Sequence, residues 1–178
     1  MRKIVGLVML IMFVLPTLVT AESAKPNIAI IYYDNLNSHK SIRSESENFY
    51  ITKLTDRFSP NYTIFYDEQN KLKLENAGIN DPATAERGDI ISVFRNDNLS
   101  YIILIDMLPK VVFNGKTTSS QYLKVIDVND NKTLYNGKFQ YQSRYASSMG
   151  HTGELFKQTE EVLIRLLLPA VKDISRSF

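Results

Sequence analysis

Three aspartates end, or lie inside, apolar runs of the sequence. Asp34 ends "NIAIIYYD", Asp67 ends "NYTIFYD", and Asp106 lies within "LSYIILIDML". If these runs form parallel strands, their carboxyl ends meet at one edge of a sheet, where open α/β sheets bind ligands. Oxygen ligands there suit a hard cation such as Mg²⁺ or Ca²⁺. The pattern predicts a candidate ligand site, with a small-ligand or divalent-metal-dependent enzyme as the alternative function: Asp34, Asn35, Asp67 and Asp106.

A simpler interpretation is that each aspartate caps the turn after a strand. Asp106 also lies between Ile105 and Met107 inside a longer apolar run, so its side chain can point away from the other two. We favour this interpretation, and we assign no catalytic residue, metal or cofactor.

Nucleophilic catalysis has little support in the sequence. The two histidines are His39, which follows Ser38 in a polar stretch, and His151, which lies in "SSMGHTGE". Adjacent residues on a loop seldom point at each other. The chain has no G-x-S-x-G elbow, phosphate-binding loop, dinucleotide fingerprint or H-E-x-x-H motif. The main prediction is therefore a protein without enzymatic activity.

The amino terminus has the pattern of an export signal. Arg2 and Lys3 precede an apolar stretch, and Val19 and Ala21 occupy the small-residue positions of a cleavage site. We predict a signal peptide over residues 1–21 and a single α/β domain over 22–178. A leader retained as an anchor is the alternative. The mature chain is then exported, to the periplasm or the medium, without stable insertion in a membrane.

Composition narrows the class of protein. Cysteine is absent, so there is no disulfide, thiolate metal site or lipid-bearing cysteine, which favours a bacterial envelope over a eukaryotic secreted domain. The chain has 21 basic and 19 acidic residues, and two of the basic ones, Arg2 and Lys3, belong to the predicted leader. Balanced charge gives no case for a nucleic-acid partner.

Periodicity and turn signals predict a mixed sheet of about five strands with three helices packed on it. Residues 27–34 are apolar on both faces, which is typical of a central strand. Pro109 lacks an N–H, so it indicates an edge or a bulge in its strand. The predicted order is β-α-β-α-β-β-β-α: strand 27–34, helix 44–58, strand 61–67, helix 82–95, strand 99–113, a hairpin over 121–145 around "NDNK", and a helix from Thr152.

The second strand of that hairpin alternates. Phe139, Tyr141 and Tyr145 face one way, and a polar set faces the other. If this strand lies at the edge of the sheet, its free backbone groups can pair with another chain. The candidate partner-binding residues for an envelope protein or a second copy are Lys138, Gln140, Gln142 and Arg144.

Two segments carry a resemblance to known families. "NIAIIYYDN" and "LKVIDVNDNKTLYNGKF" resemble the first strand and the late hairpin of bacterial envelope α/β domains of the curli secretion channel (CsgG) type and of the TolB amino-terminal domain. Tyr32 and Tyr33 replace the usual small or prolyl strand ending, and Asn131 replaces a frequent glycine. The resemblance implies an envelope accessory or assembly protein that acts through protein–protein contacts. It does not imply a channel.

Overall fold

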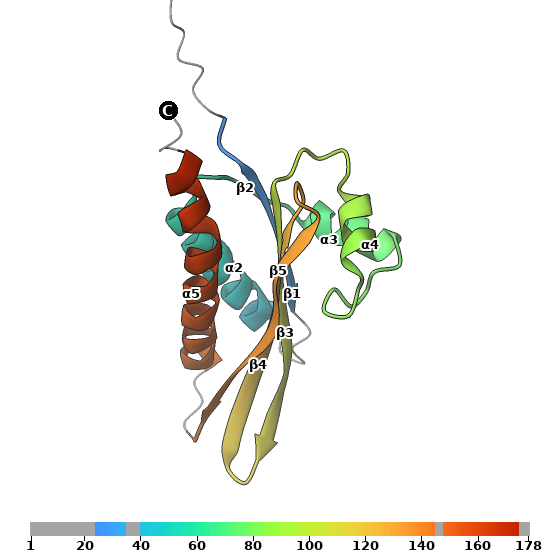
Figure 1. Cartoon of the computed structure of the whole chain (residues 1–178). Helices are drawn as coiled ribbons and strands as arrows, with labels where there is room; N and C mark the ends of the chain where they lie inside the picture. Colours follow the sequence, from blue (N-terminus) through green and yellow to red (C-terminus); the bar gives the residue numbers. More distant parts are fainter. Residues whose placement is uncertain (1–23, 35–39, 145–147, 175–178) are drawn as a thin grey trace, which may run out of the picture.

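The computed structural model describes residues 24–34, 40–144 and 148–174. A central sheet separates two layers of helices, with α2 and α5 on one face and α3 and α4 on the other (Figure 1). The strands are β1 (Asn27–Asp34), β2 (Thr63–Tyr66), β3 (Tyr101–Phe113), β4 (Lys116–Asp127) and β5 (Lys132–Ser143). The helices are α2 (Lys40–Phe58), α3 (Glu68–Asn76), α4 (Arg87–Val93) and α5 (Ser148–Ile174).

The strand order is β2-β1-β3-β4-β5. β1 pairs in parallel with β2 and β3, whereas β3, β4 and β5 pair antiparallel in succession. This confirms the mixed α/β sheet and the central place predicted for residues 27–34. Four helices in the described part, instead of the three predicted, pack on the sheet.

Alternate residues of β1 belong to two separate cores. Ile28, Ile30 and Tyr32 face α2 and α5, where they pack among Leu54, Phe58, Leu163 and Leu167. Ala29, Ile31 and Tyr33 face α3 and α4, where Leu74, Ile90 and Phe94 cover them. Burial on both faces explains why this strand is apolar or aromatic at every position from Ile28 to Tyr33.

The second predicted helix, over residues 82–95, was wrong at its start. Asp81 and Pro82 begin a turn, in which Asp81 accepts the N–H of Ala83 at 3.0 Å, and helix α4 begins only at Arg87. The amine of Lys124 in β4 binds the carbonyl oxygens of Pro82 and Ala85, each at 2.8 Å. This tertiary contact holds the turn in place of a first helical turn.

The added helix is α3, in a segment predicted as a polar connection. Asp67 is its N-cap and accepts the N–H of Gln69 at 2.9 Å. Leu74 is the buried residue of α3. A helix with one buried residue has almost no apolar stripe, so the sequence of this segment does not display helical periodicity. Local capping and one buried leucine are sufficient here because the sheet lies beneath the helix.

β3 and β4 form a long hairpin that extends past both helix layers (Figure 1). The register shifts between Leu108 and Val111, which confirms the bulge predicted at Pro109. Asn114 and Gly115, with φ of 49° and 70°, connect the strands as a two-residue turn. Positive φ at both positions is the geometry of a type I′ turn.

β5 is an edge strand, as the proposed role of the late hairpin requires. Its side chains from Lys138 to Ser143 alternate between exposed and half-buried, in agreement with the predicted two-faced strand. Tyr145, assigned to the buried face, lies outside the described residues. In the described part of the chain, no helix combines the length and the apolar character needed to cross a bilayer.

Candidate functional site

The free edge of β5 presents one set of backbone groups outward. The Asn114-Gly115 turn makes Phe113 and Lys116 a hydrogen-bonded pair, so the even-numbered residues of β4 direct their backbone groups toward β3. At the other end, the N–H of Val128 donates to the carbonyl of Ser100 at 2.9 Å, which gives the same alternation. Odd-numbered residues of β4 therefore face β5.

The partners of these odd residues fix the orientation of β5. Ser119 pairs with Tyr141, and Gln121 pairs with Phe139, so Tyr141 and Phe139 direct their backbone groups inward. Lys138, Gln140 and Gln142 then direct their N–H and C=O groups away from the sheet. No strand among the described residues pairs with that side of β5. These three predicted residues thus lie at a row of free donors and acceptors.

The side chains of the predicted set are exposed, and all four belong to β5 or follow it: Lys138, Gln140, Gln142 and Arg144. The Gln142 amide donates to the hydroxyl of Thr118 at 3.1 Å, which links β5 to β4 on the surface. Gln140 lies two residues earlier in β5, opposite Ser120. A backbone change at Gln140 therefore leaves the Gln142–Thr118 hydrogen bond in place.

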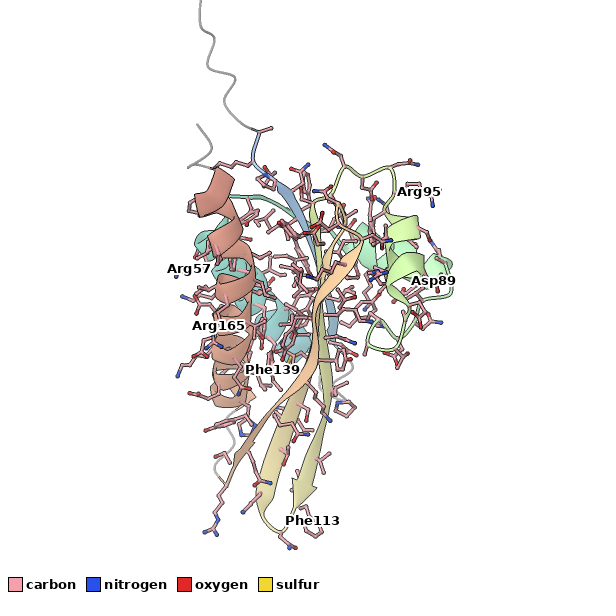
Figure 2. All side chains as sticks on the ribbon, viewed as in Figure 1. Arg57, Asp89, Arg95, Phe113, Phe139 and Arg165 are labelled. Carbon is pink, nitrogen blue, oxygen red and sulfur yellow. The ribbon has the colours of Figure 1, made fainter. Side chains whose placement is uncertain are left out.

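The inner face of β5 is aromatic and holds the strand against α5. The rings of Tyr135 and Phe139 stack with centroids 5.7 Å apart and planes at 29°. Gly137 lies beneath this stack, and a Cβ at that position would lie 2.7 Å from the Tyr135 hydroxyl. Phe139 points toward the helix layer in Figure 2. The edge is therefore supported from one side and open on its backbone side.

A buried polar chain ties β4 to the two helices beneath this edge. The Tyr50 hydroxyl of α2 donates to Oε1 of Gln121, and Nε2 of Gln121 donates to Oγ1 of Thr159 in α5 at 2.6 Å. Thr159 in turn donates to the carbonyl of Leu155 at 3.1 Å. Tyr50, Gln121 and Thr159 are all fully buried. Burial raises the pKa of the Tyr50 phenol above its usual range, so it remains a donor.

A second buried pair joins the same elements. Oγ of Ser119 lies 2.7 Å from Nδ1 of His151, and the ring of Tyr141 meets the imidazole edge-on with centroids 5.0 Å apart. Burial, and next the charge of Lys110, lower the pKa of His151. Ser119 is 1% exposed and His151 2% exposed, so both side chains of the pair are buried. The sequence does not display this pairing, because 32 residues separate the two positions.

The structure gives the predicted aspartates different surroundings. Asp67 is occupied as the cap of α3, and Asp106 is 4% exposed within β3, paired in register with Tyr33. Asn35 and the side chain of Asp34 lie outside the described part. Among the described residues, no group of three or more histidines, acids or cysteines is arranged to hold a metal. The ligand site stays a prediction.

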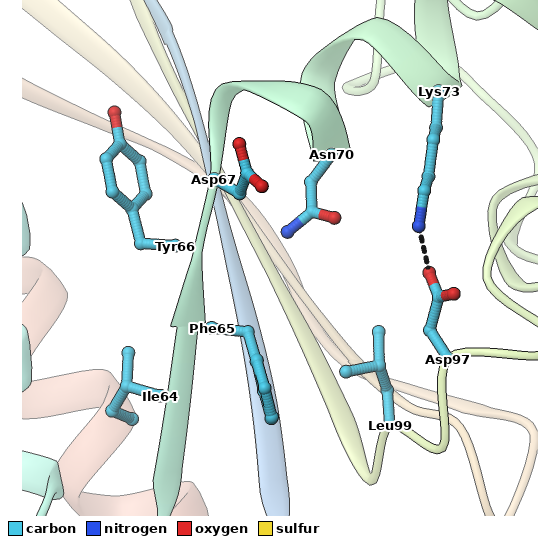
Figure 3. A pocket seen from close by; sticks show the side chains of 8 residues that line it. All are labelled: Ile64, Phe65, Tyr66, Asp67, Asn70, Lys73, Asp97 and Leu99. Atoms are coloured by element: carbon cyan, nitrogen blue, oxygen red, sulfur yellow. Dashed lines mark hydrogen bonds and ion pairs between the residues drawn. The ribbon is translucent and has the colours of Figure 1, made fainter.

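An open hollow of about 420 Å³ adjoins Asp67 at the other edge of the sheet (Figure 3). Phe65 and Tyr66 of β2 form one wall, and Asn70 and Lys73 of α3 form another. Lys73 pairs with Asp97 on one side of the hollow at 2.6 Å. The charges of Lys73 and Asp97 offset each other, and the remaining carboxylate of the hollow, Asp67, accepts the N–H of Gln69 as the cap of α3.

Comparison with known proteins gives information on the fold alone. Neither a protein-family model nor a curated protein sequence matches the chain. The hypothetical protein CT253 of Chlamydia trachomatis matches with a TM-score of 0.51 and 10% identity, over 80% of this chain and 95% of CT253. This match shows a shared fold.

Two further matches are to proteins of other bacteria. The lipoprotein GNA1162 of Neisseria meningitidis gives a TM-score of 0.46 and 13% identity over 79% of this chain and 99% of its own. TolB of Acinetobacter baumannii gives 0.43 and 15% identity over 80% of this chain and 28% of TolB. The CsgG-type part of the resemblance stays a prediction. The chain thus has the α/β fold of CT253.

Proposed function

We propose that this chain is an exported, non-enzymatic accessory or assembly protein of the bacterial cell envelope that binds its partners by pairing along β5. The observation that carries the proposal is the outward row of backbone groups at Lys138, Gln140 and Gln142 on an edge strand of 12 residues. A strand added at such an edge gains main-chain hydrogen bonds along its length.

The surroundings of this edge suit a docking strand. The mean strand in a globular protein is about 5–6 residues, so an edge of twice that length offers many pairing positions. The aromatic stack of Tyr135 and Phe139 and the buried chain through Gln121 hold the strand from beneath. Lys138 disfavours unspecific strand addition, which leaves pairing to partners that accommodate its charge.

The envelope location and the lack of activity have separate support. The leader pattern over residues 1–21 and the absence of cysteine favour export in a bacterium. The Ser119–His151 pair is buried, and Lys73 and Asp97 at the hollow beside Asp67 form an ion pair with each other. A protein of this kind acts through its surface.

The test is a crosslinked pull-down of the mature chain from the envelope fraction of its native host. Gln140→Pro removes one outward N–H, and prolines are tolerated at edge strands when the missing N–H faces out. Gln140→Thr is the matched control, because it changes the same side chain and keeps the N–H. Partners are expected with wild type and Gln140→Thr, and their loss is expected with Gln140→Pro.

Circular dichroism and thermal melting first establish that each variant folds. A partner set that is the same for Gln140→Pro and wild type would remove β5 from the interaction. Fractionation of the host tests the location separately, with the processed chain expected outside the cytoplasm. Full-length precursor recovered from the cytoplasm would contradict export.

A further inference from the structure

The tip of the β3–β4 hairpin exposes three consecutive apolar side chains. Val111, Val112 and Phe113 are 59%, 70% and 72% exposed. The tip extends beyond the helices of both layers, and Phe113 lies at its far end (Figure 2). Every residue from Pro109 to Lys116 is exposed. The hairpin tip therefore presents apolar side chains that the helices do not cover.

The alternation of a strand puts these side chains on both faces of the hairpin. Val111 and Phe113 point to one face and Val112 points to the other, because successive residues of a strand alternate. A flat protein surface covers only one face of a two-stranded tip. A medium that surrounds the tip covers both faces at once.

The charges around the tip have one sign. Lys110 and Lys116 flank the apolar residues, and Arg144 follows Ser143, which pairs with Thr117. No aspartate or glutamate occurs from Met107 to Ile126 or from Lys132 to Arg144. Within the described residues neither lysine forms an ion pair. A basic collar around an apolar tip complements an anionic lipid surface.

We infer that the hairpin tip binds reversibly to the surface of an anionic phospholipid bilayer, with Val111, Val112 and Phe113 among the acyl chains and Lys110 and Lys116 at the phosphates. Interfacial segments enter about 5–10 Å into the headgroup and acyl boundary. This is contact with one leaflet, and the chain does not cross the membrane. The inference does not rest on pairing along β5.

The chain has no tryptophan, so a single one introduced at the tip reports on that site alone. Phe113→Trp is expected to show a blue shift of its emission with vesicles of phosphatidylglycerol and phosphatidylcholine, and none with phosphatidylcholine alone. Leu72→Trp is the control, because Leu72 is 48% exposed but lies on α3, away from the tip. It is expected to show no shift with either vesicle.

Flotation of the unlabelled wild type with the same vesicles measures affinity without the added tryptophan. Lys110→Gln and Lys116→Gln are each expected to weaken binding about five-fold, since a basic residue near an anionic surface contributes about that factor. Added salt is expected to weaken binding of the wild type more than binding of a variant that carries both lysine changes. Val112→Thr keeps the size and the β-branch, and it is expected to weaken binding at all salt concentrations.

Three results would overturn the inference. The first is failure of the wild type to float with phosphatidylglycerol vesicles. The second is flotation without a shift at position 113, which would place the lipid contact elsewhere. The third is a blue shift of Phe113→Trp that appears without vesicles and grows with protein concentration, which would assign the tip to a second copy of the chain.

Discussion

The buried chain from Tyr50 through Gln121 to Thr159 makes a sharp prediction about stability. Tyr50→Phe removes the donor to Gln121 and leaves Oε1 of that amide buried without a partner. Gln121→Leu removes the acceptor and leaves the Tyr50 hydroxyl in the same condition. Each single variant is expected to lower the free energy of unfolding by about 1–3 kcal/mol, the cost of one unsatisfied buried polar group.

The double variant removes both ends of this hydrogen bond and leaves no new orphan. Thr159 loses the amide of Gln121 but still donates to the carbonyl of Leu155 at 3.1 Å. The double variant is therefore expected to be more stable than the sum of the single changes implies. The coupling should be about 2–6 kcal/mol, the sum of the two single costs, because replacing both partners by apolar groups of similar shape is nearly neutral.

Urea unfolding followed by circular dichroism measures all four proteins of this cycle. With a slope of about 1–3 kcal/mol per molar urea, a change of about 2 kcal/mol moves the midpoint by roughly 1 M, which is readily resolved. Equal slopes across the four proteins serve as the control that unfolding exposes the same surface. Effects that add to within about 0.5 kcal/mol would refute the assigned hydrogen bond.

Three other outcomes follow from the same structure. Burial lowers the pKa of His151, so the stability that its neutral, buried ring contributes is fully present above the unfolded pKa near 6.5. That stability is lost as the pH falls below this value, by at most about 1.4 kcal/mol per pH unit. His151→Gln should flatten this dependence of stability on pH in urea titrations between neutral and acidic pH, and an unchanged dependence would assign it to other groups. Gly137→Ala should lower the melting temperature by about 2–4 °C, since its Cβ would displace the Tyr135 ring, whereas a rise, the usual effect of replacing a strand glycine, would contradict the stacked arrangement. Millimolar Mg²⁺ or Ca²⁺ should leave the melting temperature unchanged because Asp67 already caps α3; a rise that Asp34→Asn abolishes would instead support the ligand site at the aspartates.

Local signals predicted most of the sheet. Unbroken apolar character placed β1 at the centre, the missing donor of Pro109 marked the bulge in β3, and "NDNK" marked the turn between β4 and β5. The alternation of β5 from Lys138 onward separated its open face from its aromatic face. These features depend on residues close together in the chain, so the sequence displays them directly.

The helices on the second face depended on contacts that no local pattern shows. Asp81 and Pro82 have the signature of a helix start, yet Lys124, which lies about 40 residues away, takes the carbonyl groups that would begin the helix. The cap at Asp67 was visible as an acid after a strand, but α3 has one buried leucine and little apolar periodicity. The hydrogen bonds from the buried amine of Lys124 therefore prevented the helix predicted at Pro82. The weak apolar pattern of α3 concealed that helix in the sequence.

The candidate site was predicted in part for the same reason. The polar residues of β5 were visible in the sequence, whereas the direction of their N–H groups required the pairing through β4 and the turn at Asn114 and Gly115. The exposed tip at Phe113 was also concealed, because a strand of valines and phenylalanine has the pattern of a core strand until the hairpin is seen to extend beyond the helices.

A photoreactive benzoylphenylalanine at Gln140 of the chain, in its native host, tests docking along β5 directly. Irradiation of whole cells should yield a distinct crosslinked product in the envelope fraction, because the proposed partner strand lies beside this residue. The same amino acid at Leu72, which is 48% exposed on α3, should not yield that product. No product at Gln140, or one product shared by both positions, would contradict docking along β5.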